Sequence, residues 1–362
     1  MRFSFRLAVL LLSLLGLELG ARAAVAAGWL RYAEKRSEGG GRRYIDDLDP
    51  AFGVWHYPNV ELPGIRTNSH GMRDRERSFE SGGASRVALI GDSFVEGYGV
   101  PDGQRLCDHL ERLSGREHLN FGCSGGFGPL QEALLYETLA LRFEHDRVFL
   151  FCLPDNDFED LVRGDSQRYR PYLEADGSGG FRVVYPLAFE ARERARPPSW
   201  SKRLRLAARN HSRFLNALGQ VRLEHAFPGL ERADPSYDRV EPELAEQLLH
   251  CYERLITAAA PRPVWIFVIP RRADFVASAR GRLLGRAPAL LADWARGRPG
   301  VRVVDLLPLF ERELAARELS AGDLFLPNDG HWSPLGNRLA AELVLAAAAA
   351  DPGAGSPAEA PR

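Results

Sequence analysis

Two stretches far apart in the chain contain residues that together could carry out acyl transfer. In "ALIGDSF", Ser93 directly follows an apolar run, in a turn that Gly91 permits because glycine has no Cβ. A serine hydroxyl is a poor nucleophile until a neighbouring base takes its proton. In "NDGHWSP", His331 can be that base, and Asp329, just before it, can fix the tautomer of the imidazole. These residue types predict a serine nucleophile, its base and an orienting acid.

Two further stretches can supply hydrogen-bond donors. "NFGCSGGFGP", residues 120–129, is rich in glycine, which lets backbone N–H groups approach a ligand closely. "PDNDF" places the side-chain amide of Asn156 at the end of another apolar run. Donors aimed at one point stabilise the oxyanion that forms in acyl transfer. We therefore predict an oxyanion site here, with Asp92 and Asp157 supporting the serine and asparagine loops.

A sheet must position these residues, because five apolar strand-like runs alternate with helix-like segments along the chain. Continuous apolar strands separated by helices form a parallel sheet covered on both faces, and such sheets bind ligands at the carboxyl ends of their strands. We therefore predict a three-layer α/β/α, flavodoxin-like fold with a parallel five-stranded sheet. The strand-like runs are residues 86–90, 118–121, 147–153, 263–269 and 301–306. The helical candidates are residues 104–114, 129–143, 241–260, 276–297 and 334–350.

Residues 158–240 interrupt this alternation and are predicted to be an insertion after the third strand. They contain the hairpin-like "EADGSGGFRVVYP" and the basic stretch "SKRLRLAARNHSRFLNAL". The insertion could shape a substrate cleft or dock on a membrane surface, although an ordinary solvated helix is favoured for its arginines.

The N-terminal residues 1–30 have the pattern of an export signal, a short cationic start followed by "LAVLLLSLLGL". Cleavage after Ala23 is possible, but the apolar character continues toward the roughly 20 residues that span a bilayer, so an uncleaved anchor is favoured. Residues 31–48 are typical of a linker, residues 49–350 form the body, and residues 351–362 are predicted to be a disordered tail. We therefore expect an exported protein of the periplasm or cell envelope, attached to the membrane by its N-terminal segment.

Composition argues against several other functions. The formal net charge is -1 with no basic block, so nucleic-acid binding is not predicted. The cysteines show no C-x-x-C pairing and the remaining histidines no metal-ligand spacing, so no metal site is predicted. No phosphate loop or dinucleotide fingerprint occurs, and no cofactor is implied. The four cysteines could form disulfides in an exported protein, but buried small apolar side chains are favoured.

A second serine also has the spacing of a nucleophile. Ser124 lies in a G-x-S-x-G sequence, the nucleophile elbow of α/β-hydrolases. That fold needs several strands before its elbow, whereas only one strand of the body precedes Ser124 here, and no HGGG-type loop is present. Ser124 is therefore predicted to line the glycine-rich loop, with Ser93 as the nucleophile.

The four motifs, in this order, resemble the blocks of the SGNH (GDSL) hydrolase superfamily. "GDSF", "NFGCSG", "PDND" and "DGHW" correspond to the four blocks and span most of the body. The resemblance implies that Ser93 attacks an ester carbonyl and that His331 is its base, with Asp329 as the orienting acid. It also implies that the oxyanion is held by the backbone N–H groups of Ser93 and Gly125 and by the side chain of Asn156.

The sequence departs from the common family pattern in two places. The histidine block reads D-x-H followed by Trp332, where many members have D-x-x-H, and this form resembles a branch that contains polysaccharide O-acetyltransferases and membrane-anchored relatives. The segment "RTNSHGMRDRE", residues 66–76, resembles what precedes the serine block in anchored bacterial members. Glycine usually opens the third block, whereas Pro154 and Asp155 precede Asn156 here, which predicts a differently set loop.

The expected activity is that of a serine esterase. It would cleave acyl esters, O-acetyl esters among them, on an envelope carbohydrate or a small molecule, through an acyl-enzyme. One alternative is an O-acyltransferase that moves acetyl groups to a polysaccharide. The other is a non-catalytic binding or scaffold protein of the envelope.

Overall fold

The computed structural model describes residues 2–27, 44–161, 170–185, 211–215, 241–279, 286–327 and 329–350, together with Trp200, Leu204 and Ala208. The chain divides into two compact units. The first comprises Met1–Arg42, Ala191–Arg232 and Leu326–Asp329, and the second comprises Arg43–Glu190, Ala233–Phe325 and Gly330–Arg362. Most of the predicted linker and all of the predicted tail lie outside the described residues.

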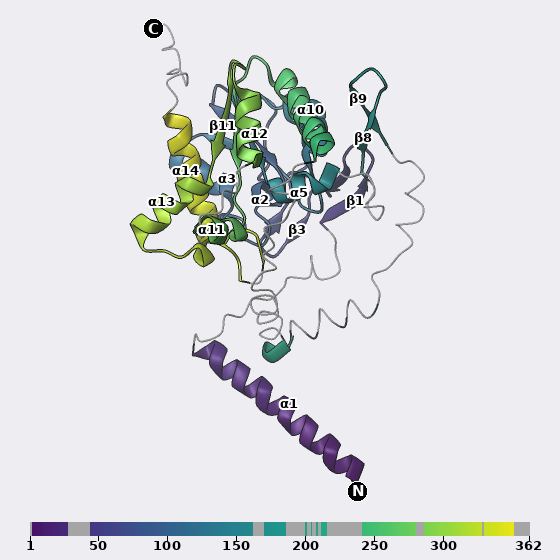
Figure 1. Cartoon of the computed structure of the whole chain (residues 1–362), viewed down its shortest axis with the longest axis vertical. Coiled ribbons are helices and arrows are strands. Elements are labelled where there is room, and N and C mark those ends of the chain that lie inside the picture. Colours follow the sequence, from purple (N-terminus) through teal and green to yellow (C-terminus); the bar gives the residue numbers. More distant parts are fainter. Residues whose placement is uncertain are drawn as a thin grey trace. The chain divides into compact units, whose positions relative to one another are not determined.

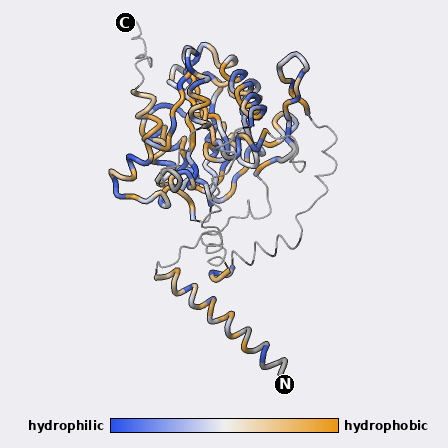
Figure 2. Tube along the Cα trace, in the orientation of Figure 1, coloured by the Kyte–Doolittle hydropathy of each residue, from blue (hydrophilic) through white to orange (hydrophobic). Residues whose placement is uncertain are grey.

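The first unit contains the long N-terminal helix α1 (Arg2–Ala26), along which hydrophobic residues recur (Figure 2). Glu18 in this helix accepts a hydrogen bond from the Arg22 side chain at 2.8 Å. It also accepts from the backbone N–H groups of Arg213 and Phe214, each at 3.1 Å. Among the residues that the structure describes, no helix is long and apolar enough to cross a membrane. The transmembrane helix expected within residues 1–30 is not found among residues 2–27, the part of that segment that the structure describes.

The second unit is built on a five-stranded sheet in which every neighbouring pair of strands is parallel. The strand order is β11-β10-β7-β5-β6, which is the flavodoxin-like arrangement with the first and third strands of the sheet side by side. This confirms the predicted α/β fold. The strands are β5 (Arg86–Gly91), β6 (Glu117–Gly122), β7 (Arg147–Cys152), β10 (Val264–Val268) and β11 (Val301–Asp305).

Two hydrophobic cores, one on each face, explain why the strands are continuously apolar. Val87 and Leu89 of β5 pack into one core, and the alternate residues Ala88 and Ile90 pack into the other. Helices α4, α10 and α12 cover the face that carries Ile90, and helices α3, α11, α13 and α14 cover the opposite face (Figure 1). These helices are α3 (Leu106–Ser114), α4 (Pro129–Thr138), α10 (Pro242–Ala259), α11 (Arg272–Ala279), α12 (Arg286–Ala295), α13 (Leu307–Arg317) and α14 (Pro334–Ala349).

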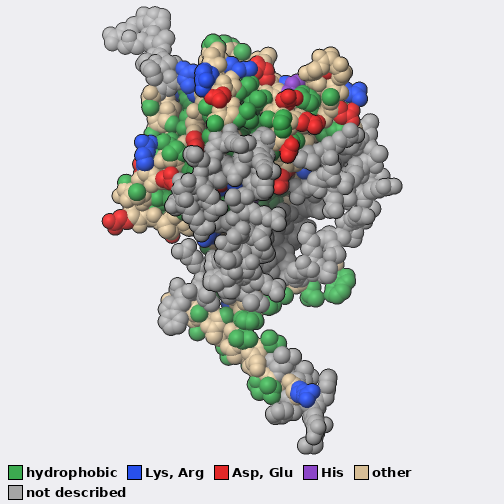
Figure 3. Space-filling view, in the orientation of Figure 1, with side chains coloured by type: hydrophobic (Ala, Val, Ile, Leu, Met, Phe, Trp, Pro, Cys, Tyr) green, Lys and Arg blue, Asp and Glu red, His purple; other side chains and the backbone are tan. Residues whose placement is uncertain are grey.

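Short helices follow two of the central strands and contain Ser93 and Asn156. They are α2 (Ser93–Glu96), directly after β5, and α5 (Pro154–Asp157), directly after β7. The described part of the chain also contains the 3₁₀ helices η2 (Ala140–Arg142), η3 (Glu159–Leu161) and η4 (Ala321–Leu324). On the face of the protein drawn in Figure 3, acidic and basic side chains are interspersed, in keeping with the near-zero net charge.

The helical prediction differs from the structure in two places. The single helix expected over residues 276–297 is two helices, α11 and α12. Pro288 lies in the first turn of α12, where a missing N–H is tolerated, and it could not lie in the middle of a longer helix. Helix α13 is not among the predicted helices, and Pro308 lies in its first turn, where a missing N–H is tolerated.

The body begins earlier than the predicted residue 49. Strand β1 (Ile45–Asp49) pairs antiparallel with β2 (Gly53–His56), and Tyr44 and Ile45 are buried in the core beneath α4 and α10. The acidic residues of β1 give it the composition of a linker, although Ile45 is buried. A second small sheet pairs β3 (Glu61–Leu62) with β4 (Ile65–Arg66).

Only part of the predicted insertion is described. Its hairpin is confirmed, because β8 (Tyr172–Ala175) pairs antiparallel with β9 (Phe181–Val184). Asp176 supports the turn between them by accepting hydrogen bonds from the backbone N–H groups of Ser178 and Gly180 at 2.8 and 3.0 Å. Most of the basic stretch that follows lies outside the described residues.

Candidate active site

Ser93 and His331 lie in contact although 238 residues separate them in the sequence. The Oγ atom of Ser93 is 2.7 Å from Nε2 of His331. Ser93 is the first residue of α2 and follows the carboxyl end of β5, so it lies at the sheet edge where parallel sheets bind ligands. Gly91 is required at this bend, because a Cβ there would lie 2.5 Å from the Val95 side chain.

Backbone contacts before helix α14 hold the loop of His331. Trp332 forms an antiparallel bridge with Phe325, and the N–H of Ser333 donates to the carbonyl of Leu324 at 2.8 Å. Ser333 then caps α14, accepting a hydrogen bond from the N–H of Gly336 at 3.1 Å. Gly336 allows this close packing, because a Cβ there would lie 2.1 Å from the carbonyl oxygen of Leu324.

The imidazole of His331 lies against two aromatic rings. Its centroid is 5.1 Å from the ring of Phe94 and 4.5 Å from the ring of Tyr98, both at tilted angles. Phe94 also packs edge-on against the buried Trp332 at 5.0 Å. These contacts limit the orientations of the imidazole, and Nε2 faces the serine. A hydroxyl and an imidazole in this geometry can act as nucleophile and general base.

Asp92 connects the serine turn to the asparagine loop. One carboxylate oxygen accepts the backbone N–H of Phe94 at 2.9 Å, which caps α2, and the other accepts Nδ2 of Asn156 at 3.0 Å. Burial raises the pKa of Asp92 to about 6, and the hydrogen bonds from Phe94 and Asn156 oppose that rise. Nδ2 of Asn156 carries a second hydrogen, which is the one that can serve an oxyanion.

Asp157 supports the loop after β7, which also carries Asn156. Its Oδ2 accepts the backbone N–H of Leu153 at 3.0 Å and the hydroxyl of Tyr252 at 3.3 Å. Burial and the neighbouring charge of Asp92 raise the pKa of Asp157 well above its usual value. Both acids therefore accept backbone N–H groups beside the loops that follow β5 and β7, and their supporting roles stay predictions.

The glycine-rich loop follows β6, which is the strand next to β5. Gly125 has a φ of +94°, and a Cβ there would lie 3.3 Å from the Val54 side chain, so the position favours glycine. Ser124 is buried, and its backbone N–H donates to Oε2 of Glu96 at 2.5 Å. The imidazole of His331 is paired with Ser93 instead, which favours Ser93 over Ser124 as the nucleophile.

Asp329 lies in Leu326–Asp329, a short stretch that groups with the first compact unit. Its backbone N–H donates to the carbonyl of Leu326 at 3.2 Å, which closes a turn two residues before His331. Its role as the orienting acid stays a prediction.

Three residues near the serine were not predicted from the sequence: Phe94, Glu96 and Tyr98. Phe94 and Tyr98 contact the imidazole, and Glu96 contacts the glycine-rich loop. The clustering of these residues within "SFVEGY", directly after the motif serine, was the available signal, because a helix that starts there must pack beside the site.

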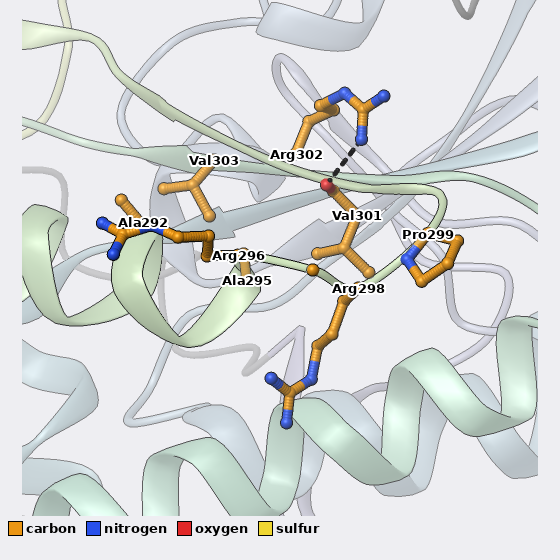
Figure 4. Close-up of a pocket in the computed structure, with 9 residues that line it drawn as sticks. Ala292, Ala295, Arg296, Arg298, Pro299, Val301, Arg302 and Val303 are labelled. Atoms are coloured by element: carbon orange, nitrogen blue, oxygen red, sulfur yellow. Dashed lines mark hydrogen bonds between the residues drawn. The ribbon is translucent and has the colours of Figure 1, made fainter.

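A cavity of about 460 Å³ lies elsewhere, around the amino end of β11. It is lined by α12 and by the turn that leads into β11 (Figure 4). The side chains of Arg296, Arg298 and Arg302 point in different directions around it, so they do not gather positive charge at one point. Arg298 is instead stacked on Trp294, with its Cζ 4.4 Å from the ring centroid.

The other sequence-based expectations concern metals and cysteines. Within the described part of the chain, no group of three or more His, Cys, Asp or Glu residues is placed to hold a metal ion. All four cysteines are buried free thiols, which are Cys107, Cys123, Cys152 and Cys251.

Comparison with known proteins gives structural likenesses only. No known family profile matches the sequence, and no curated protein matches it. A member of the lipolytic protein G-D-S-L family from Veillonella parvula DSM 2008 is similar with a TM-score of 0.39 and 16% identity, covering 74% of this chain and 100% of that one. The lipase Lip_vut3 from a goat rumen metagenome is similar with a TM-score of 0.38 and 11% identity, covering 73% and 97%. At TM-scores below 0.5, these likenesses carry no conclusion about activity, which has to come from the site.

Proposed function

We propose that the protein is a serine esterase that cleaves acyl esters through an acyl-enzyme. The observation that carries the proposal is the 2.7 Å contact between Ser93 Oγ and His331 Nε2. The contact lies at the carboxyl edge of a parallel sheet, beside a side-chain amide and a glycine-rich loop. Nucleophile, base and hydrogen-bond donors at one edge are the parts that acyl transfer from an ester needs.

In the first half of the reaction, Nε2 of His331 takes the proton from Ser93 as Oγ attacks the acyl carbon. The tetrahedral oxyanion is stabilised by the N–H groups of Ser93 and Gly125 and by Nδ2 of Asn156. One such donor is typically worth about 3 kcal/mol in the transition state. The intermediate collapses when the imidazolium gives its proton to the leaving alcohol oxygen, and the acyl group stays on Oγ.

In the second half, His331 takes a proton from water, and the hydroxide attacks the acyl-enzyme. The second tetrahedral intermediate collapses when the imidazolium protonates Oγ of Ser93, which releases the carboxylic acid. A sugar hydroxyl in place of water would give O-acyl transfer by the same steps, and the D-x-H-W form of the histidine block supports that alternative.

We place this activity in the cell envelope, on an acyl ester of a carbohydrate or a small molecule. The cationic and apolar N-terminal stretch supports export and an association with the membrane. Fractionation of cells that express the full chain tests the location, because an exported protein is absent from the cytoplasmic fraction.

Hydrolysis of a p-nitrophenyl acetate ester by the full chain tests the proposed reaction. Ser93→Ala and His331→Ala are expected to lose activity, whereas Ser124→Ala, the matched control, is expected to retain it. Loss of activity in Ser124→Ala with retention in Ser93→Ala would overturn the assignment of the nucleophile. A labelled acetyl ester supplied with an oligosaccharide separates the two outcomes, because label in free acetate means hydrolysis and label on the sugar means transfer.

A further inference from the structure

Glu96 is a fully buried carboxylate three residues after Ser93, at the end of the same short helix. Its Oε2 accepts the backbone N–H of Ser124 at 2.5 Å. Its Oε1 accepts the hydroxyl of Tyr44 at 2.8 Å. Hydrogen bonds to an ionised carboxylate are shorter and stronger than neutral ones, so Glu96 binds the glycine-rich loop firmly.

Two buried basic side chains, those of Arg73 and His56, lie beside the carboxylate of Glu96. Nη1 of Arg73 is 3.8 Å from Oε1, and Nε2 of His56 is 3.6 Å from Oε2, with both side chains almost fully buried. Burial raises the pKa of Glu96, but the neighbouring His56 and the charge of Arg73 outweigh that effect and lower the pKa to about 2. Glu96 is therefore an anion at neutral pH.

Arg73, in the segment at residues 66–76, contacts the loop that follows α2. Its guanidinium donates to the carbonyls of Gly97 and Val100, each at 2.6 Å, in the loop that follows α2. The N-terminal part of the body thus holds the far end of α2 through Arg73 and compensates the charge of Glu96 with the same side chain.

The backbones of α2 and the glycine-rich loop are in direct contact. A Cβ at Gly122 would lie 2.2 Å from the backbone nitrogen of Glu96, so only glycine fits at this end of β6. The N–H of Ser124 is held by Glu96, and Gly125 follows with a φ of +94°. With the Cys123–Ser124 peptide group fixed, only the two backbone torsions of Ser124 set the direction of the Gly125 N–H.

We propose that Glu96 is a positioning residue that holds the Cys123–Ser124 peptide group, and thereby orients the next peptide group so that the N–H of Gly125 faces the acyl group attacked by Ser93. This inference rests on the proposed function, because it concerns the oxyanion site of the same reaction. One helical turn carries both the nucleophile and the anchor of the oxyanion loop, so the two parts keep a fixed separation.

Two substitutions in the full chain test the proposal. Glu96→Met keeps the length of the side chain and removes every acceptor, and kcat for an acyl ester should fall about 100-fold while KM changes little. Glu96→Gln keeps one acceptor oxygen, and kcat should fall only about 10-fold. The affinity for a trifluoromethyl ketone, which forms a tetrahedral adduct, should weaken by the same factors as kcat.

Tyr44→Phe is the matched control. It removes the hydroxyl bound to the other oxygen of Glu96 and leaves the bond to Ser124 intact, so kcat should stay close to that of the unchanged protein. Equal losses of kcat in Tyr44→Phe and Glu96→Met would contradict the proposal, because they would mean that general loosening of the buried network causes the effect.

The outcomes also separate this inference from the proposed function. If Ser93→Ala keeps full activity, the proposed function fails. If Ser93→Ala is inactive and Glu96→Met has the original kcat, only this inference fails. Should Glu96→Met not fold, the Ser124 amide proton of the unchanged protein decides by NMR. A resonance far downfield with slow hydrogen exchange supports the proposal, and an ordinary resonance with fast exchange overturns it.

Discussion

Nδ2 of Asn156 donates to Oδ2 of Asp92 at 3.0 Å, which joins the loop after β7 to the turn that carries Ser93. Strands β5 and β7 are neighbours in the sheet, and at this pair of strands the direction of the strand order changes. Open parallel sheets bind ligands at such a switch point. The bond between Asp92 and Asn156 therefore fixes two parts of the candidate site relative to each other.

Replacing Asp92 by alanine should reduce both activity and stability. Loss of the cap on α2 is expected to cost about 1 kcal/mol of unfolding free energy. Release of the Asn156 amide is expected to lower kcat about 100-fold, the effect of losing one oxyanion donor. Ester turnover and urea unfolding check the two effects separately.

Asp305→Ala is the matched control for that substitution. Asp305 ends β11, another strand of the same sheet, and accepts the backbone N–H of Leu307, the first residue of α13, at 3.0 Å. This variant should lose a similar amount of stability and keep its kcat. Equal kcat values for Asp92→Ala and Asp305→Ala would show that Asp92 does not contribute to catalysis at this site.

The raised pKa of Asp92 predicts a pH dependence of stability. The pKa is about 6 in the folded protein and 3.8 for the ordinary side chain, so between these values the folded state binds more protons than the unfolded state. Stability contributed by this group therefore falls as the pH rises from about 4 to 6, by roughly 3 kcal/mol at most, and is constant above that. Asp92→Asn lacks this pH-dependent contribution to stability, because asparagine does not titrate.

Urea unfolding of the protein and of Asp92→Asn at several pH values checks this expectation. The unfolding free energy of Asp92→Asn relative to the unchanged protein should increase across that window and then level off. A difference that is constant from pH 4 to pH 7 would show that Asp92 has an ordinary pKa in the folded state.

Much of the fold could be predicted because its signals are local. The apolar run that ends at Gly91 and the Ser333–Pro334 start of α14 mark a strand end and a helix start by composition alone. Glu96 could not be predicted, because its contacts with Tyr44 and Ser124 join three segments that are separated in the sequence. An isolated glutamate in a four-residue helix carries no periodicity that would mark it as buried.

The start of the body could not be predicted for a related reason. The acidic residues of β1 give that strand a linker-like composition, and only its pairing with β2 buries Ile45. Composition reports average exposure, whereas pairing decides which side of a strand is covered.

Gly336→Ala should displace the histidine loop. The new Cβ would lie 2.1 Å from the carbonyl oxygen of Leu324, so the loop or α14 has to move. The unfolding free energy is expected to fall by roughly 2–4 kcal/mol, and kcat should fall at temperatures where the protein is still folded. Gly322→Ala is the control, since a Cβ there makes only an ordinary contact at 3.6 Å with Ser320. Similar losses in both variants would contradict this account of the loop.

Removing the ring of Tyr98 should release the imidazole of His331. The two ring centroids are 4.5 Å apart, and Tyr98→Ala leaves the ring of Phe94, at 5.1 Å, against the imidazole. We expect kcat to fall about 10-fold as the imidazole leaves its productive orientation. Tyr98→Phe keeps the ring and should retain most of the activity. A kcat for Tyr98→Ala equal to that of Tyr98→Phe would show that the ring does not orient the base.

Covalent labelling of the full chain with an activated phosphonate ester, followed by peptide mass spectrometry, tests directly whether Ser93 is the nucleophile and His331 is its base. We expect one adduct, on the peptide that contains Ser93, and a large loss of labelling rate in His331→Ala. An adduct on Ser124, or labelling of Ser93 at the same rate without the imidazole, would contradict it.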